Sequence, residues 1–369
     1  MPQPKPVTLL KGRGSTERIA HRFSADAREP FDDGWDAAAD ADEPAPPPAT
    51  QVRWEDAKSA IAYNDSPDLG FDRSLNPYRG CEHGCAYCFA RPTHAYLGLS
   101  PGLDFETVII AKRGLADRLA HEISRPRYAV APITIGTATD AYQPVERELR
   151  LTRGVLQVLR DAEHPWAMVT KGSGIERDLD LIAPMGRAGL AAVYVTLTTL
   201  DAAVMRTLEP RAAAPWRRLR IVRALAEAGV PVGVSLAPQI PFINEDLEQT
   251  LAAAAEAGAT SAFYTVLRLP WEVAPLFEQW LAAHFPDRAA RVMARVREMR
   301  GGRAYDARFG PRMQGQGVWA ELLAQRFDKA CARLGLNRDR RVLDTTRFQP
   351  AALTTPPAPA VNEAQGRLF

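Results

Sequence analysis

Two stretches of the sequence decide the fold class: AAVYVTLTTL at residues 191–200 and PWRRLRIVRALAEAGV at residues 215–230. The first is rich in apolar and β-branched residues, which is typical of a buried strand. The second repeats apolar residues at helical spacing and predicts a helix that stops at Gly229. A buried strand followed by an amphipathic helix is the unit of a parallel sheet covered by helices.

The same unit recurs on both sides of this pair. The further strands that we expect are ITIGTA (133–138), WAMVTK (166–171), PVGVSLAPQI (231–240) and SAFYTVLRLP (261–270). The further helices are ERELRLTRGVLQVLRDA (146–162), ERDLDLIAPMGRAG (176–189) and NEDLEQTLAAAAEAGA (244–259), the last with Asn244 as its N-cap. Five strands can be counted, and a sixth could lie just before residue 81. We predict an α/β protein with an open or partial (β/α) barrel. A doubly wound sheet is the alternative, because strand order cannot be read from one sequence.

The ends of the chain differ in composition from this core, which we place at residues 51–275. Residues 1–50 contain eight acidic residues and one arginine between Asp26 and Glu43, followed by PAPPPAT, which predicts a disordered acidic, proline-rich arm. The alternative is an arm that docks on the core. Residues 276–345 are predicted to be a mainly helical extension, and residues 346–369 a flexible tail.

The extension contains a run of arginines. Between Arg288 and Arg312 there are eight arginines and two acids. This local excess of positive charge is either a patch that faces phosphate or a solvated helix followed by a loop.

Bulk composition identifies no partner but favours a compartment. There are 46 Lys plus Arg and 44 Asp plus Glu, a formal net charge of +2. The first residues lack the apolar region of a signal peptide, and no apolar run is long enough for a membrane span. We therefore expect a cytoplasmic protein without a membrane partner. In that compartment clustered cysteines are more typical of metal sites or catalysis than of disulfides.

Three of the four cysteines lie in CEHGCAYC, as Cys81, Cys85 and Cys88. Thiolates are soft ligands that suit zinc, copper(I) and iron–sulfur clusters. Zinc would need a fourth ligand, such as His83 or His94. The fourth cysteine, Cys331, lies in a predicted helix, where a free cysteine packs as a small hydrophobic residue. Three thiolates without a fourth suggest a [4Fe–4S] cluster with one iron open to a substrate or cofactor.

CEHGCAYC also resembles the Cys-x3-Cys-x2-Cys motif of radical S-adenosylmethionine (radical SAM) enzymes, including the aromatic Tyr87 before the last cysteine. The wider stretch SLNPYRGCEHGCAYCFARPTH (74–94) is similar to the subgroup related to spore photoproduct lyase. The resemblance extends through GTATDAYQPVE, TKGSG, TLEPRAAAPWRRL and PQIPFINE, and covers roughly residues 70–270.

The resemblance implies a partial (β/α)6 TIM-like barrel with the cluster on the loop after the first strand. Cys81, Cys85 and Cys88 would bind three irons, and S-adenosylmethionine would chelate the fourth. The cofactor would be cleaved to methionine and a 5′-deoxyadenosyl radical, which abstracts hydrogen from a substrate. An external one-electron reductant such as flavodoxin or ferredoxin would be needed. The subgroup and the arginine-rich extension favour nucleic-acid repair or modification.

The resemblance further implies a set of residues that contact the cofactor. They are Tyr87, Thr137, Thr139, Asp140, Lys171, Thr196, Thr198, Glu209 and Arg211. Lys171 occupies the place where lyase relatives have a lysine that helps to hold the cofactor carboxylate. Glu209 and Arg211 would read the amino acid end of the cofactor, with a structural ion pair as the alternative.

One departure from the subgroup separates this chain from thymine-dimer repair. Photoproduct lyases carry a cysteine hydrogen donor near the end of the second strand, whereas this chain offers Thr137 or Thr139 there. A hydroxyl is a poor hydrogen-atom donor compared with a thiol, so we do not expect the lyase reaction. Tyr142, Tyr264 or Cys331 could serve instead. The rival hypothesis from another class is a non-catalytic iron–sulfur or zinc-binding interaction protein.

Overall fold

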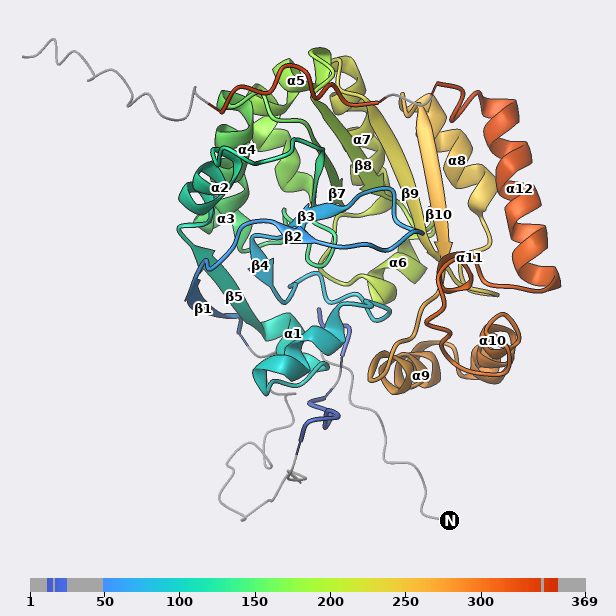
Figure 1. Ribbon diagram of the computed structural model, residues 1–369. Coiled ribbons are helices and arrows are strands. Elements are labelled where there is room, and N and C mark those ends of the chain that lie inside the picture. The colour runs from blue at the N-terminus through green and yellow to red at the C-terminus, as the bar shows by residue number, and fades with distance from the viewer. Residues whose placement is uncertain (1–11, 16, 25–48, 340–341, 351–369) are drawn as a thin grey trace, which may run out of the picture.

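The computed structural model describes residues 12–15, 17–24, 49–339 and 342–350 (Figure 1). The acidic run from Asp26 to Glu43 and most of the predicted tail lie outside the described residues. Within the described ranges, no helix has the length and apolar character needed to cross a membrane.

The centre of the molecule is a seven-stranded sheet whose order is β10-β9-β8-β7-β6-β3-β2. Six of these strands are parallel neighbours. They are β3 (Arg73–Leu75), β6 (Ile133–Ile135), β7 (Trp166–Thr170), β8 (Ala191–Thr196), β9 (Val232–Gln239) and β10 (Ser261–Val266). The short β2 (Ala62–Tyr63) pairs antiparallel with β3 at one edge. Figure 1 shows this curved sheet with helices along its outside.

The strand order decides between the two architectures that the sequence left open. The parallel strands follow one another in chain order, without the reversal of a doubly wound sheet. In the part of the chain that the structure describes, β10 and β3 do not pair, so the barrel is open. The prediction of a partial barrel with five strands after the cysteines and one before them is confirmed.

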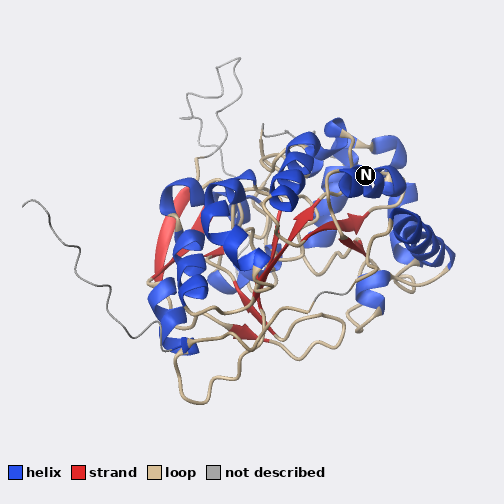
Figure 2. Ribbon diagram, turned by 90° about the horizontal axis from the view of Figure 1, so that it is seen from above, coloured by secondary structure: helices blue, strands red, loops and turns tan. Residues whose placement is uncertain are grey.

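Amphipathic helices pack on the outer side of the sheet, as Figure 2 shows from above. They are α2 (Leu115–Ile123), α4 (Leu151–Asp161), α5 (Leu179–Arg187), α6 (Ala202–Leu208), α7 (Pro215–Glu227) and α8 (Leu247–Glu256). Between them and the strands lies the main apolar core, in which Trp166, Val193 and Leu236 are fully buried.

Three local expectations differ from the structure. The helix predicted at 146–162 is split into α3 (Glu146–Leu149) and α4, because Arg150 adopts a left-handed conformation with φ of 53°. The helix predicted at 176–189 begins as the 3-10 turn η3 (Ser173–Asp178) and becomes α5. Asn244 is not the N-cap of α8, which is Asp246. Its side chain instead accepts from Ile240 N and donates to Thr198 O and Pro238 O, joining the ends of β8 and β9.

A second, three-stranded sheet lies beside the first in the order β1-β5-β4. Its strands are β1 (Gln51–Asp56), β4 (Tyr78–Arg79) and β5 (Val108–Arg113). Between β4 and β5 the chain forms η2 (Arg91–Leu97) and α1 (Leu103–Thr107). The loop between β4 and η2, residues 80–90, contains the three clustered cysteines and is called the cysteine loop below.

The region after β10 is helical, as the sequence predicts. It contains α9 (Val273–His284), α10 (Pro286–Glu298), α11 (Pro311–Gln314) and α12 (Val318–Leu334). Cys331 is buried in α12, as expected from its apolar spacing.

Residues 12–15 and 17–24 form an N-terminal segment that lies against α1 and α9 (Figure 1). The Ser15 amide donates to the Glu106 carboxylate over 2.9 Å. Arg22 forms an ion pair of 2.8 Å with Glu272 next to α9. These described residues are therefore in contact with the core.

Candidate active site around the cysteine loop

The three clustered cysteines lie on one tight loop at the carboxyl ends of the parallel strands. Cys81 and Cys85 are buried and Cys88 is half-buried. The Cys81 amide donates to Phe105 O over 2.9 Å, which holds the start of the loop on α1. Gly80 has a φ of 79°, and a Cβ there would lie 3.0 Å from Phe105 O. Glycine is therefore required where the chain turns into the loop.

The donor chemistry of this loop fits an iron–sulfur cluster. Burial raises the pKa of Cys81 well above its ordinary value and that of Cys85 to about 12. The charges of Cys85 and Cys88 add to the shift at Cys81, and that of Cys88 adds to the shift at Cys85. Buried thiols of this kind lose their protons to a metal rather than to water. Among the described residues, no group of three or more His, Cys, Asp or Glu side chains is arranged so that it could hold a single metal ion.

A buried ion pair between Arg91 and Glu106 fixes the backbone of the loop. The Arg91 guanidinium donates to Cys85 O over 2.9 Å, to Gly84 O over 3.1 Å and to Glu106 Oε1 over 2.5 Å. Both side chains are fully buried. Glu106 also accepts from the amides of Gly14 and Ser15 in the N-terminal segment. The pair therefore links the cysteine loop to the chain that covers it.

The N-terminal segment lies directly on the cysteine loop. A Cβ on Gly14 would lie 1.7 Å from Gly84 O, so only glycine permits this approach. Arg13 adds a hydrogen bond of 3.0 Å to Glu106 O. The loop is thus enclosed by a segment that is more than sixty residues away in sequence.

A second set of contacts holds the loop from the side of α6 and α7. The Tyr87 hydroxyl donates to Glu209, which also forms a fully buried ion pair with Arg218. The Ala86 amide donates to Leu208 O over 3.0 Å. Arg218 further donates to Thr196 O over 2.9 Å at the end of β8. The aromatic of the cysteine motif is therefore fixed by a buried carboxylate.

The structure places the predicted contacts Glu209, Thr196 and Thr198 inside this packed network. Glu209 is 1% exposed, and its oxygens are engaged by Tyr87, Arg218 and the Thr198 hydroxyl. Burial would raise the pKa of Glu209, but the charges of Arg218 and then Lys171 lower it, so this carboxyl remains ionised. Thr196 and Thr198 are buried at the end of β8.

Lys171, directly after β7, points its charge at the cysteine loop. Its ammonium lies 5.8 Å from the centre of the Tyr87 ring. Burial lowers its pKa, but Cys85 and then Glu209 outweigh this and raise the pKa above its usual value. Among the described residues no side chain forms a hydrogen bond or ion pair with the ammonium. Lys171 is therefore a positive charge beside the thiols that remains available to an anionic ligand.

Asp140 fixes the loops after β6 and β7. Its carboxylate accepts from the Thr170 hydroxyl over 2.6 Å and from the Lys171 amide over 2.8 Å. His83, buried inside the cysteine loop, approaches the same carboxylate at 3.4 Å. Burial would raise the pKa of Asp140, but His83, Lys171 and the Thr170 hydroxyl together lower it, so the group is ionised. This carboxylate positions Lys171 by its backbone.

Thr137 and Thr139 follow β6 and meet the chain next to the cysteine loop. The Thr139 hydroxyl donates to Tyr78 O over 3.1 Å. Asn76 donates to the Thr137 hydroxyl over 3.4 Å and accepts from the amides of Ala138 and Thr139. Ordinary turn chemistry accounts for Thr139, whereas Thr137 is half-buried and partly open.

Arg211 lies on the other side of the cysteine loop. It forms an ion pair of 3.1 Å with Glu82, so a structural ion pair accounts for this guanidinium. A cleft of about 120 Å³ lies between this arginine and the loop after β7. Its lining includes His83, Tyr142, Arg147, Gly172 and Arg211.

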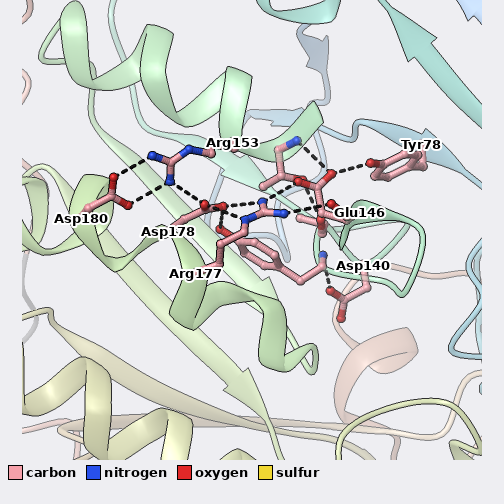
Figure 3. A network of polar contacts seen from close by, with 10 residues as sticks. Tyr78, Asp140, Glu146, Arg153, Arg177, Asp178 and Asp180 are labelled. Carbon is pink, nitrogen blue, oxygen red and sulfur yellow. Dashed lines mark hydrogen bonds and ion pairs between the residues drawn. The ribbon is translucent and has the colours of Figure 1, made fainter. Parts of the chain in front are cut away.

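The floor beneath these loops is a network of acidic and arginine side chains (Figure 3). The Tyr78 hydroxyl in β4 donates to Glu146, which also accepts from Arg177 over 2.8 Å. Arg177 in turn bonds Asp178, the carboxylate that accepts from Tyr142. Arg153 extends the chain of ion pairs from Asp178 to Asp180. The network ties β4, which leads into the cysteine loop, to α3 and η3.

Sequence reasoning missed Arg91, Glu106, Arg218 and Asn76. Each is a single polar residue whose partner lies elsewhere in the chain, so periodicity carries no signal for it. Asn76 and Arg91 flank the cysteine motif within the quoted stretch 74–94, and that position was the available clue.

Comparison with known proteins agrees with the class that the fold and the loop define. Residues 75–254 match the family described as the Radical SAM superfamily. The Mycobacterium tuberculosis protein named "Uncharacterized protein Rv2578c" is 35% identical over 276 residues, which is 74% of this chain and 77% of that protein. The protein named "Uncharacterized protein MJ0683" of Methanocaldococcus jannaschii is 23% identical over 213 residues, which is 58% of this chain and 76% of that protein.

Among solved structures the fold is similar to that of spore photoproduct lyase. One such structure, with bound AdoMet and dinucleoside spore photoproduct, has a TM-score of 0.55 and 15% identity. The match covers 77% of this chain and 80% of that chain. The chain belongs to the radical SAM superfamily.

Proposed function

We propose that this protein cleaves S-adenosylmethionine reductively, with a [4Fe–4S] cluster held by Cys81, Cys85 and Cys88. The observation that carries the proposal is the placement of three thiols on one enclosed loop, beside the ammonium of Lys171. When bound, the cluster and the cofactor supply one-electron cleavage of the sulfonium to methionine and a 5′-deoxyadenosyl radical. An external one-electron reductant, such as a flavodoxin or ferredoxin, is the partner that this chemistry requires.

The protein's own residues hold the cysteine loop, orient the cofactor and enclose the site. Arg91 and Glu106 fix the backbone around Cys85, and Tyr87 is fixed by Glu209. The Lys171 ammonium is placed to bind a carboxylate, because it lies beside the cysteine loop and no side chain of the described residues forms a hydrogen bond or ion pair with it. Gly14 and its neighbours cover the loop and exclude water from it.

The remaining residues that the resemblance places at the cofactor fall into two groups. They are Thr137, Thr139, Asp140, Thr196, Thr198 and Arg211. Thr137 is partly open and retains a role at the cofactor. The others are buried or bonded to protein partners, as are Tyr87 and Glu209, and we assign them to positioning the loops that surround the cofactor.

For the substrate, we propose a nucleic acid that is repaired or modified. Its support is the fold shared with spore photoproduct lyase, one of whose structures contains a dinucleoside spore photoproduct. The lyase reaction itself is not proposed, since neither Thr137 nor Thr139 can replace a thiol as hydrogen donor. A non-catalytic iron–sulfur or zinc-binding protein is the rival.

The test is anaerobic reconstitution followed by metal analysis and reduction with dithionite. Four iron and four sulfide per chain, with release of 5′-deoxyadenosine and methionine, are the expected results. One zinc per chain would support the rival. Absence of 5′-deoxyadenosine from a fully loaded and reduced protein would overturn the proposed function.

A further inference from the structure

Arg268 lies where the last strand of the barrel meets the cysteine loop. It follows β10, which ends at Val266, and its guanidinium lies 5.0 Å from the centre of the Phe89 ring. Phe89 comes directly after Cys88 and is 46% exposed. Among the described residues, the one hydrogen bond of Arg268 is a weak contact of 3.4 Å with Met313 Sδ in α11. Its buried Nε has no partner there.

A second arginine, Arg300, is held against the same stretch of chain, at the residue that precedes Arg268. Arg300 is 1% exposed and donates to Leu267 O over 2.6 Å and to Pro311 O. Its Nε, like that of Arg268, has no partner within the described residues. Burial and then the charge of Arg268 lower the pKa of Arg300 to about 10. The two cations therefore repel each other in a partly desolvated place.

Neither guanidinium has a carboxylate ion-pair partner in the described part of the chain. Asp306 raises the pKa of Arg300, but this carboxylate is itself bonded to Arg308 over 2.6 Å. Several other arginines of the run from Arg288 to Arg312 have partners. They include Arg295 with Glu298, Arg297 with Glu278 and Arg312 with Asp68. Arg300 is the buried arginine of this run, and within the described residues it has no carboxylate partner.

Two neighbouring cations without an anion, one of them buried, are unfavourable, because desolvation and mutual repulsion both disfavour the charged forms. A bound oxyanion removes both costs, and a guanidinium matches phosphate geometry with paired donors. Two positive charges match a phosphate better than a single carboxylate. A ligand can reach Arg268, which is partly exposed, and a planar group beside the phosphate can stack on exposed Phe89.

We infer that Arg268 and Arg300 form an anion site that takes a phosphate group of the substrate at the cysteine loop. Arg268 is the contacting residue, and Arg300 adds charge from behind while its bonds to Leu267 O and Pro311 O hold β10 against α11. The assignment of the ligand to the substrate rests on the proposed function. The anion site itself does not, because its binding can be measured without any reaction.

The test is calorimetric titration of the reconstituted full-length protein with inorganic phosphate, and with acetate for comparison. The variant Arg268→Gln should weaken phosphate binding roughly ten- to a hundred-fold, the value of a lost charge-assisted hydrogen bond. Arg268→Lys keeps the positive charge but loses the paired donors of the guanidinium. Its affinity for phosphate should lie between those of the parent and Arg268→Gln. The matched control is Arg303→Gln, an exposed arginine of the same region, which should bind phosphate as the parent does.

Melting temperature and iron content are measured for each variant, so that a folding defect is recognised. Equal loss in Arg268→Gln and Arg303→Gln would overturn the site, because binding would then be diffuse. Tighter binding of acetate than of phosphate would overturn the phosphate assignment. Release of 5′-deoxyadenosine with dithionite is followed separately, so failure of the anion site is distinguishable from failure of the proposed function.

Discussion

Replacement of Arg91 by methionine should destabilise the protein strongly and loosen the cysteine loop. The change retains a long apolar stem but removes a fully buried guanidinium that makes hydrogen bonds to Cys85 O, Gly84 O, Pro101 O and Gly102 O. It also leaves the buried Glu106 carboxylate without its cation. Removing one member of a buried ion pair costs about 3–5 kcal/mol.

A loss of about 4 kcal/mol corresponds to a fall of ~5 °C in melting temperature for a chain of this length, from the usual unfolding entropy per residue. Arg91→Lys should recover little, because an ammonium cannot reach the carbonyls and the carboxylate together. The double variant Arg91→Met with Glu106→Leu should be more stable than Arg91→Met, since it leaves no unpaired buried charge.

The assays are thermal melting and iron content after anaerobic reconstitution. The control is Arg297→Met, which breaks an exposed ion pair of 2.9 Å with Glu278 and should cost no more than about 1 kcal/mol. If Arg91→Met melts within a degree of this control and retains its iron, the ion pair does not hold the loop, and the reasoning is refuted.

Three further results are expected. Lys171→Ala should weaken cofactor binding about ten- to a hundred-fold while iron content is unchanged, as measured by equilibrium binding; unchanged affinity would remove the lysine from the cofactor site. Cys331→Ala should keep full iron content, whereas alanine at Cys85 should lose it; iron loss in both would replace the three-thiolate site by a four-thiolate one. Burial lowers the pKa of His164 to about 4, so stability should be fully present above pH 6.5 and fall by about 3 kcal/mol as the pH drops towards 4. Melting scans at several pH values should show this fall flattened in His164→Gln, and an identical pH profile in that variant would contradict it.

The parallel barrel could be predicted because its strands are continuous apolar runs and its helices are amphipathic. β8 and α7 begin and end within a few residues of the predicted positions. The first strand of the barrel was harder to locate, since Arg73–Leu75 has only three residues and no periodicity. The break at Arg150 depends on a backbone conformation that residue type does not reveal.

The residues of the candidate site also divide into those that the local sequence indicates and those that depend on contacts through space. The cysteine spacing is local and singled out the three thiols, and Lys171 was named from the resemblance to lyase relatives. The roles of Glu209 and Arg211 depend on which partners reach them through space, and these are Arg218, Tyr87 and Glu82. Sequence reasoning cannot rank such partners, because charged residues are common on every loop.

The N-terminal segment has a consequence for the time course of synthesis. Its contacts with Glu272 and Gln279 join residues 250 and 262 positions apart. A chain that grows from its N-terminus makes this segment first, yet the surface on which it lies is complete only after α9 has emerged. At ordinary translation speeds that delay is roughly 10–50 s. During this interval the cysteine loop already exists but is uncovered, so the segment that is made first is among the last to settle.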